Sequence, residues 1–193
     1  MAEDSPQRIQ KDQVNLDIWS TTQVTEPQVN IIRRAILLRG LSGAGKSRFA
    51  SILLERYLRE DGCVGCIFSA DQYHVRDGIY KFDPKRLDAG HVDCFGRYDE
   101  FLLRYNKDSR SVVAIVDNTN IRAYEMSPYI QLAKLRGWSH EIITIPCDPL
   151  VAFKRNQHRT PFGVIMNHWQ LLQSEQLPPH FIQVPYLEEE SIG

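Results

Sequence analysis

The segment from residue 40 to residue 47 has the residue types and spacing of a phosphate-binding loop. It fits the pattern G-x-x-x-x-G-K-[ST], and its residues are Gly40, Leu41, Ser42, Gly43, Ala44, Gly45, Lys46 and Ser47. The glycines let backbone N–H groups converge on phosphate oxygens, and a helix that follows adds free N–H groups. Lys46 would neutralise the β- and γ-phosphates, and the Ser47 hydroxyl would bind Mg²⁺. We therefore predict a nucleoside triphosphate site formed by residues 40–47 together with Arg48.

Two carboxylates are expected at the same edge of a sheet as this loop. Asp71 follows the apolar run 66–68, and Asp117 follows the β-branched run 111–116. Asp71 has the position of a base that accepts the proton of an attacking hydroxyl, although an Asp can also cap a helix or turn. Asp117 would hold Mg²⁺ through water, and the Asn118 and Asn120 amides would bind acceptor oxygens. The alternative for this second segment is a simple polar turn.

The densest basic run of the chain is residues 154–159. If it is helical, Arg155 and Arg159 lie four residues apart on one face, where two guanidinium groups can reach one anion. A mobile lid that carries them would complete the site when nucleotide is bound. The alternative is a solvated basic surface.

The elements that must position these residues follow from the apolar pattern. Strands are predicted at 35–38, 66–68, 111–116 and 141–145, and helices at 46–60, 83–105, 126–136 and 164–172. Gly137 closes the predicted helix at 126–136, and the pair Asp83-Pro84 begins the predicted helix at 83–105. Strands that alternate with helices predict an α/β fold with a mostly parallel central sheet flanked by helices, and ligands bind at the carboxyl ends of its strands.

Length and composition predict one domain and a protein that is not secreted. The 193 residues are 42% hydrophobic and carry a net charge of -1, so a polyanion would have to be held by a local basic groove. We expect a polar extension at 1–30, the domain at 31–175 and a tail at 176–193. The chain has no apolar run of transmembrane length and no secretory signal, which predicts a cytoplasmic or nuclear protein without membrane partners. Cys63 and Cys66 form a C-x-x-C, for which a redox pair or half a zinc site is the alternative to simple packing.

The order and spacing of several motifs resemble the P-loop polynucleotide 5′-hydroxyl kinase group. This group includes phage polynucleotide kinase and the N-terminal domain of the cyclic-nucleotide phosphodiesterases. The chain is most similar to the P-loop domain of the NEDD-four-binding-protein-two-like family, over about residues 33–172. The runs that carry the similarity are RGLSGAGKS, FSADQY, RDGIYKFDPKRL, VDNTN, AYEMSPY and KRNQHR.

This resemblance implies a kinase-type P-loop fold that uses ATP and Mg²⁺, with Lys46 and Ser47 at the donor phosphates. It also implies Asp71 as the general base toward the 5′-OH end of a nucleic acid, and Arg155 and Arg159 as lid arginines. The phage pattern has an Arg three residues after the base that grips the phosphate of the acceptor. This chain has His74 there, and Arg76 is a candidate substitute. The chain also reads Asn118 where the phage pattern has Asp. Nothing in the chain resembles the pair of H-x-T motifs in the catalytic domain of the phosphodiesterases, so we expect no cyclic-phosphate hydrolysis.

Three functions are consistent with these residues. The first is transfer of phosphate to RNA or DNA, favoured by basic and aromatic side chains that would face a nucleic-acid backbone; these are Arg76, Tyr80, Lys81, Lys85 and Arg86. The alternative for this stretch is a solvated helix start. The second is a P-loop kinase that acts on a small-molecule hydroxyl. The third is an ATP-binding interaction module with little turnover.

Overall fold

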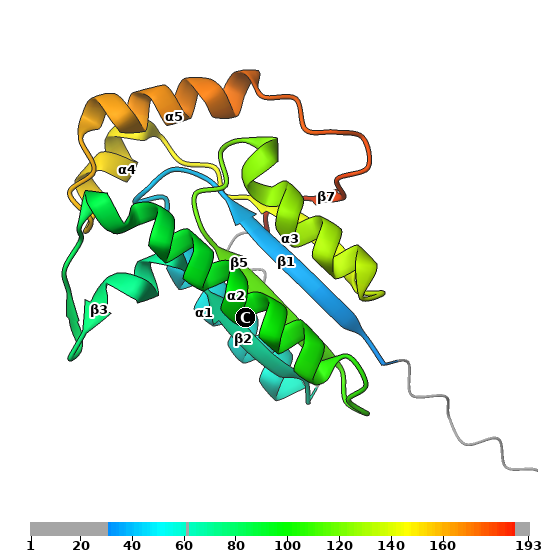
Figure 1. Ribbon diagram of the computed structural model, residues 1–193. Coiled ribbons are helices and arrows are strands. Elements are labelled where there is room, and N and C mark those ends of the chain that lie inside the picture. The colour runs from blue at the N-terminus through cyan, green and yellow to red at the C-terminus, as the bar shows by residue number, and fades with distance from the viewer. Residues whose placement is uncertain (1–30, 61, 188–193) are drawn as a thin grey trace, which may run out of the picture.

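A five-stranded parallel sheet forms the centre of the computed structural model, which describes residues 31–60 and 62–187 (Figure 1). Its strands are β1 (Arg33–Arg39), β2 (Val64–Phe68), β5 (Val112–Asp117), β6 (Ser139–Thr144) and β7 (Gln183–Val184). Their order is β2-β5-β1-β6-β7, and every neighbouring pair is parallel. The predicted α/β fold with a mostly parallel sheet is therefore confirmed. The extension predicted at 1–30 and the last six residues of the predicted tail lie outside the described residues.

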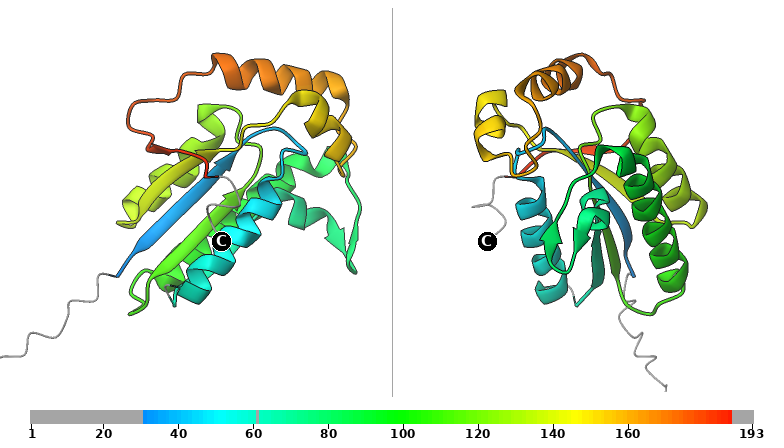
Figure 2. Two further views of the ribbon diagram at one scale, coloured as in Figure 1. Left: turned by 180° about the vertical axis from the view of Figure 1, so that it is seen from behind. Right: turned by 60° about the vertical axis from the view of Figure 1, so that its left-hand side comes forward.

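Helices cover both faces of the sheet and the edge at which its strands end (Figure 2). They are α1 (Lys46–Glu60), α2 (Leu87–Tyr105), α3 (Ala123–Leu135), α4 (Pro149–Arg155) and α5 (Phe162–Ser174). Helix α1 packs on one face, where Phe49 and Ala50 are buried, and α2 and α3 pack on the other. Helices α4 and α5 lie across the carboxyl edge. In the described part of the chain, no helix is long and apolar enough to cross a membrane.

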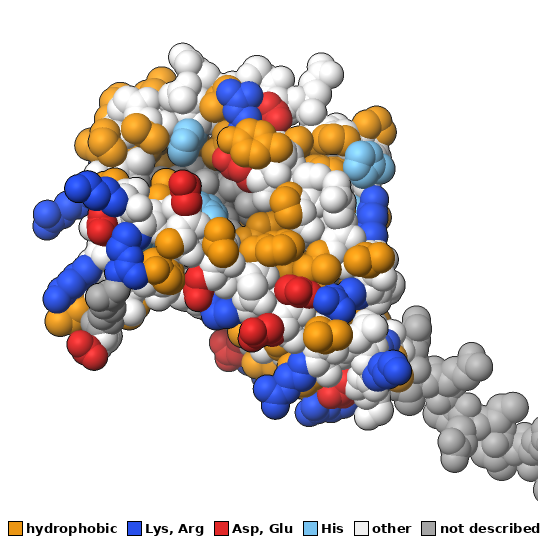
Figure 3. Space-filling model, in the orientation of Figure 1, with side chains coloured by type: hydrophobic (Ala, Val, Ile, Leu, Met, Phe, Trp, Pro, Cys, Tyr) orange, Lys and Arg blue, Asp and Glu red, His pale blue; other side chains and the backbone are white. Residues whose placement is uncertain are grey.

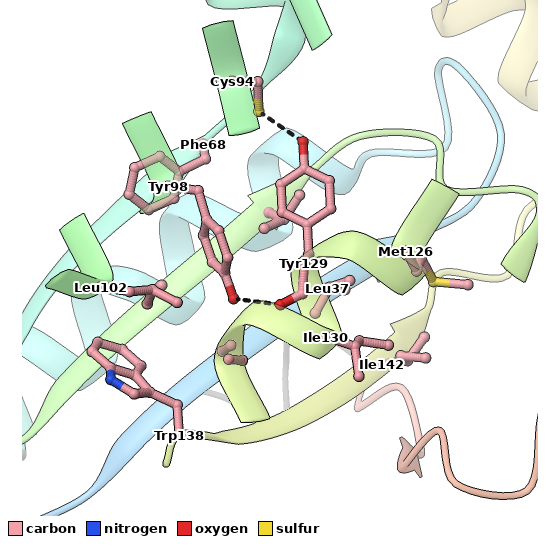
Figure 4. Close-up of a cluster of buried hydrophobic side chains, with 14 of the residues drawn as sticks. Leu37, Phe68, Cys94, Tyr98, Leu102, Met126, Tyr129, Ile130, Trp138 and Ile142 are labelled. Atoms are coloured by element: carbon pink, nitrogen blue, oxygen red, sulfur yellow. Dashed lines mark hydrogen bonds between the residues drawn. The ribbon is translucent and has the colours of Figure 1, made fainter. Parts of the chain in front are cut away.

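The core under α2 and α3 is built around two tyrosines (Figure 4). The Tyr98 hydroxyl donates to the carbonyl of Tyr129 at 3.2 Å, and the Tyr129 hydroxyl donates to the Cys94 sulfur at 3.5 Å. Both phenols therefore have a hydrogen-bond partner, which buried polar groups need. Cys94 is fully buried as a packing residue, and Cys63 and Cys66 form no disulfide.

Several short elements were not expected from the sequence. Residues Val75–Arg76 (β3) and Ile79–Tyr80 (β4) form an antiparallel hairpin that projects beside the site, and η1 (Ala70–His74) precedes it. The predicted tail contributes β7, which pairs with β6. The predicted helix at 83–105 begins as a separate 3-10 turn, η2 (Pro84–Arg86), and becomes α-helical at Leu87.

The prediction that the basic run 154–159 forms one helical face is wrong. Helix α4 ends at Arg155, and Asn156 follows with an extended backbone. Arg159 has a φ of 55°, which no α-helical residue has. The two arginines therefore do not share a helix face, because the Asn156 side chain turns the chain out of the helix by accepting from the His158 N–H and donating to the Thr160 carbonyl.

Candidate active site

The phosphate-binding loop joins the end of β1 to the start of α1, as predicted. Gly43 and Gly45 have φ values of 84° and 95°, in a region that side chains other than glycine disfavour. At Gly43 a Cβ atom would also lie 2.1 Å from the carbonyl oxygen of Ala152, so helix α4 packs directly on the phosphate-binding loop. Gly40 and Leu41 are inside the fold and hold the loop in place, since the Gly40 N–H donates to the Thr119 carbonyl at 2.9 Å.

Lys46 is buried at the first position of α1. Its Nζ donates to the carbonyl oxygens of Gly40 at 3.2 Å and Leu41 at 2.8 Å, so the ammonium lies under the loop. Burial lowers the pKa of Lys46, and the carboxylates of Asp117 and Asp71 act in the opposite direction. A buried cation at the first turn of a helix, beside free loop N–H groups, favours a polyanion such as a triphosphate.

Asp117, the last residue of β5, lies next to the beginning of α1. Burial raises the pKa of its carboxyl group, and the Ser47 hydroxyl, which hydrogen-bonds to it, and the Lys46 charge oppose that rise. A carboxylate and a hydroxyl together fit Mg²⁺, which keeps several waters and takes one or two protein ligands plus substrate phosphates. No group of three or more acidic, His or Cys side chains that could hold a metal occurs among the described residues. The pair formed by Ser47 and Asp117 therefore suits Mg²⁺ with a nucleotide better than a metal held by protein alone.

Asp71 lies in η1, just beyond the carboxyl end of β2. Ser69 caps this turn, because its hydroxyl accepts from the Asp71 N–H at 3.3 Å and the Gln72 side chain accepts from the Ser69 N–H at 3.4 Å. The Tyr80 hydroxyl of the hairpin donates to Asp71 Oδ1 at 3.0 Å, and His158 Nε2 lies 3.5 Å from Oδ2. The carboxylate is half exposed and can meet a substrate.

These groups line one cavity of about 1000 Å³. Its wall is formed by residues 42–48, 117–119 and 145–147, with Asp71, Arg155, Gln157, His158 and Tyr186. The predicted donor loop, the predicted base, the predicted metal ligands and one of the two lid arginines therefore meet in one place. Arg159 is not part of the wall.

The predicted acceptor residues are mostly committed to the fold. His74 is 4% exposed among the rings of Tyr73, Tyr80 and Phe82, and it does not line the cavity. Asn120 is 2% exposed, and its Nδ2 donates to the Leu38 carbonyl at 2.7 Å, which ties the end of β5 to β1.

Asn118 and Arg76 are placed differently from His74 and Asn120. Asn118 reaches the cavity wall, but its Oδ1 accepts from the Ala70 N–H at 2.9 Å and so fastens η1 to β5. Arg76 belongs to the strand β3, and its side chain lies outside the described residues. The structure therefore gives no support to the prediction that His74 and Asn120 bind the acceptor, because both side chains are buried in the fold.

Sequence reasoning did not assign roles to His158 or Tyr186 at the site. Tyr186 is carried to the cavity by β7 and packs on Phe49 with ring centroids 5.2 Å apart. His158 lies inside the basic run that was predicted as a helix. Asp148-Pro149, an N-cap pair like Asp83-Pro84, is a local signal for the start of the short helix α4, but it does not show where α4 ends.

A parallel sheet with a phosphate loop after its central strand, a lid segment and a carboxylate across the cavity define a P-loop kinase-type domain. A family model described as "AAA domain" matches residues 36–174, and the chain belongs to this family. Human NEDD4-binding protein 2 is 36% identical over 129 residues, which make up 62% of this chain and 7% of that protein. The chain thus spans a small fraction of the length of this relative.

Two solved structures show the same fold at low sequence identity. The structure of the Mycobacterium tuberculosis APS kinase CysC in complex with AMPPNP and APS has a TM-score of 0.53 and 16% identity, and the match covers 84% of this chain and 94% of that one. The crystal structure of APE1195 has a TM-score of 0.50 and 16% identity, with 83% and 87% covered. The fold together with the phosphate loop indicates a site for a nucleoside triphosphate.

Proposed function

We propose that this domain transfers the γ-phosphoryl group of ATP to the 5′-hydroxyl of a polynucleotide, RNA or DNA. The observation that carries the proposal is the cavity that Asp71 shares with Lys46 and Ser47. A carboxylate that faces the end of a bound triphosphate can accept the proton of an incoming hydroxyl. A GTPase-like or purely structural P-loop has no need of an acid held at this place by the second strand.

Different residues bind the phosphates, activate the acceptor hydroxyl and hold Mg²⁺ in the proposed reaction. The loop N–H groups, the start of α1 and Lys46 bind the β- and γ-phosphates, and Arg155 enters the cavity from the lid, where its guanidinium can bind phosphoryl oxygens. Asp71 orients the acceptor hydroxyl and takes its proton. Mg²⁺, held by Ser47 and through water by Asp117, would offset negative charge on the β- and γ-phosphates.

The surface next to Asp71 supports a polynucleotide as the acceptor. Lysine and arginine side chains gather over the hairpin and the start of α2 (Figure 3), among them the exposed Lys81 and Lys85. Val75 and Ile79 of the same hairpin are 46% and 56% exposed and offer apolar surface to bases. Basic side chains beside apolar and aromatic ones are typical of single-strand binding. The similarity to human NEDD4-binding protein 2 agrees with the resemblance to the NEDD-four-binding-protein-two-like family, and the polynucleotide acceptor is inferred from that resemblance.

Labelled ATP tests the proposal. The protein is incubated with γ-labelled ATP, Mg²⁺ and oligonucleotides that carry either a 5′-hydroxyl or a 5′-phosphate. We expect label on the 5′-hydroxyl oligonucleotide only, and none with Lys46→Ala. If ATP binds but no oligonucleotide is labelled at any salt concentration, the polynucleotide acceptor is excluded.

A small-molecule hydroxyl is the second candidate acceptor. The burial of His74 and Asn120 favours a small-molecule acceptor, because it leaves the hairpin as the remaining candidate for binding a nucleic-acid phosphate. The solved APS kinase structure, which has this fold, contains APS, a small molecule. A screen of nucleosides, sugars and adenylyl compounds in the same assay separates the two acceptors. Equal and negligible ATP consumption by the wild type and Asp71→Ala would instead indicate a nucleotide-binding module.

A further inference from the structure

Each carboxylate oxygen of Asp71 has a side chain of the chain itself beside it. Tyr80 of the hairpin donates to Oδ1 at 3.0 Å. His158 belongs to the loop between α4 and α5, residues 156–161, called the lid loop below, and its Nε2 approaches Oδ2 at 3.5 Å. The two rings contact each other as well, with centroids 4.7 Å apart. The candidate base therefore lies between two residues that are 78 positions apart in the sequence, one in the hairpin and one in the loop after α4.

The position of His158 depends on the phosphate loop. Its backbone N–H donates to Asn156 Oδ1 at 3.1 Å, and the same oxygen accepts from the Ser42 hydroxyl at 3.2 Å. Thr160, at the far end of the lid loop, donates to Ser42 at 3.2 Å. Any movement of the lid relative to the loop that binds phosphate therefore moves the imidazole relative to Asp71.

The two contacts on Asp71 differ in strength. The Tyr80 phenol is a neutral donor, since burial and then the charge of Asp71 raise its pKa, and 3.0 Å is an ordinary hydrogen-bond length. The imidazole is at 3.5 Å and one third exposed, and among the described residues its Nδ1 has no hydrogen-bond partner. An incoming hydroxyl would therefore displace His158 from Oδ2 and leave Tyr80 in place on Oδ1.

We propose that His158 is a positioning residue that shields Asp71: it covers Oδ2 until an acceptor hydroxyl replaces it, and so limits the hydrolysis of ATP by water. The inference rests on the proposed function, in which Asp71 is the base. The charged and titratable groups that face the imidazole are Asp71 from η1, Tyr80 from β4, Asp117 from β5, Lys46 from α1 and Arg155 from α4.

The reaction that the shield suppresses is balanced without a further reactant. When Oδ2 is free, a water molecule can hydrogen-bond to it and attack the γ-phosphorus. The water oxygen forms the new P–O bond and its proton passes to Asp71. The bond to the bridging oxygen breaks, and its electron pair leaves with ADP. An acceptor hydroxyl follows the same course, so the identity of the group on Oδ2 decides between hydrolysis and transfer.

Three variants test the shield. His158→Ala uncovers Oδ2, His158→Gln keeps an N–H donor there, and His91→Ala changes an exposed histidine of α2 that does not line the cavity. We expect His158→Ala to raise acceptor-independent ATP hydrolysis about twofold to fivefold, because the contact that covers Oδ2 is weak and partly exposed. His158→Gln should raise hydrolysis less than His158→Ala does, because it keeps an N–H donor near Oδ2, and His91→Ala should hydrolyse ATP at the wild-type rate. Adding Asp71→Asn to His158→Ala should abolish the increase.

A hydrolysis rate in His158→Ala that equals or falls below the wild-type rate overturns the shield. This result is distinct from failure of the proposed function, in which no acceptor is phosphorylated, because hydrolysis is measured without acceptor. The contact itself has a readout that needs no turnover. In NMR spectra, we expect the imidazole signals of His158 to shift on Asp71→Asn and those of His91 to stay unchanged. Unshifted His158 signals would overturn the proposal.

Discussion

At the scale of single residues, Asp71 separates binding of the donor from chemistry on the acceptor. The substitution Asp71→Asn preserves the size of the side chain and an oxygen for the Tyr80 hydroxyl, but it removes the ability to accept a proton. We expect phosphoryl transfer to slow by about 10²–10⁴-fold, the usual contribution of general-base catalysis. ATP affinity, measured by titration calorimetry, should not fall.

The matched control for this variant is Asp83→Asn. Asp83 caps η2 by accepting from the Lys85 N–H at 3.0 Å and is not part of the cavity wall. The substitution Asp83→Asn should therefore leave the rate of phosphoryl transfer unchanged. Wild-type transfer by Asp71→Asn would mean that a different group takes the proton.

Loss of the Asn118 side chain should reduce stability, because its Oδ1 accepts from the Ala70 N–H and its Nδ2 donates to the Cys94 sulfur at 3.7 Å. In Asn118→Ala the N–H of Ala70 loses its acceptor in a region where Ala70 and Asn118 are 7% and 8% exposed. A buried donor without a partner costs about 1–3 kcal/mol, and we expect this loss in the free energy of unfolding measured with urea. Asn167→Ala, on the exposed side of α5, should change it by less than about 0.5 kcal/mol. Similar values for the two variants would contradict the role of Asn118 in fastening η1 to β5.

At the scale of elements, the sequence predicts the parts of the fold that have a long apolar period or a fixed motif. Strands β1 and β5 are buried on both faces, and their continuous apolar runs were recognised within about two residues. The rule that ligands lie at the carboxyl ends of parallel strands brought Asp71 and Asp117 to the phosphate loop correctly.

Other parts could not be predicted because their structure depends on distant contacts. Strands of two residues, such as β4 and β7, are too short to show a period, so the places of Tyr80 and Tyr186 had no local signal. The end of helix α4 also depends on side-chain contacts that the sequence does not show. Asn156 looks like a helical residue within a basic run, and only its bonds to Ser42 and Thr160 reveal that it ends α4.

The contact between α4 and the phosphate loop is the element-level feature that is easiest to test. In Gly43→Ala the new methyl group would collide with the backbone oxygen of Ala152, so α4 must move away from the loop. We expect loss of ATP binding in titration calorimetry together with a lower melting temperature. Gly137→Ala is the control, since Gly137 has a similar φ of 74° with no atom within 4 Å of the added Cβ.

Both substitutions carry the backbone cost of the left-handed region, about 1–2 kcal/mol. Only Gly43→Ala should reduce ATP affinity. ATP binding by Gly43→Ala at wild-type strength would show that the lid does not need to pack on the loop.

At the scale of the whole molecule, stability should fall as the solution becomes acidic. His140 of β6 is 3% exposed, and burial lowers the pKa of its imidazole. Between the ordinary pKa of about 6.5 and this lowered value, the unfolded chain binds a proton that the folded chain does not. The free energy of unfolding therefore decreases as the pH falls through this range, and it levels off below the lowered pKa. Burial shifts the pKa of His168 in the same direction.

Urea unfolding at pH values between 7.5 and 5 measures this effect. In His140→Gln the decline with falling pH should be smaller than in the wild type, because one of the two imidazoles whose pKa is lowered by burial is gone. The same substitution at the exposed His91 should leave the decline as it is. An equal decline in His140→Gln and the wild type would contradict this account.

The overall charge makes a further prediction about the acceptor. Because the net charge is only -1, attraction for a polyanion must come from a local group of cations such as Lys81 and Lys85 beside the cavity. If each lysine neutralises one phosphate of a single strand, removing both should reduce the salt dependence of binding by a slope of about 1.4. We expect the double variant Lys81→Ala/Lys85→Ala to raise the KM for the oligonucleotide without changing the KM for ATP. The matched double variant Lys107→Ala/Lys134→Ala, which removes two exposed lysines elsewhere, should change neither, and an unchanged oligonucleotide KM in the hairpin variant would exclude this surface as the path of the strand.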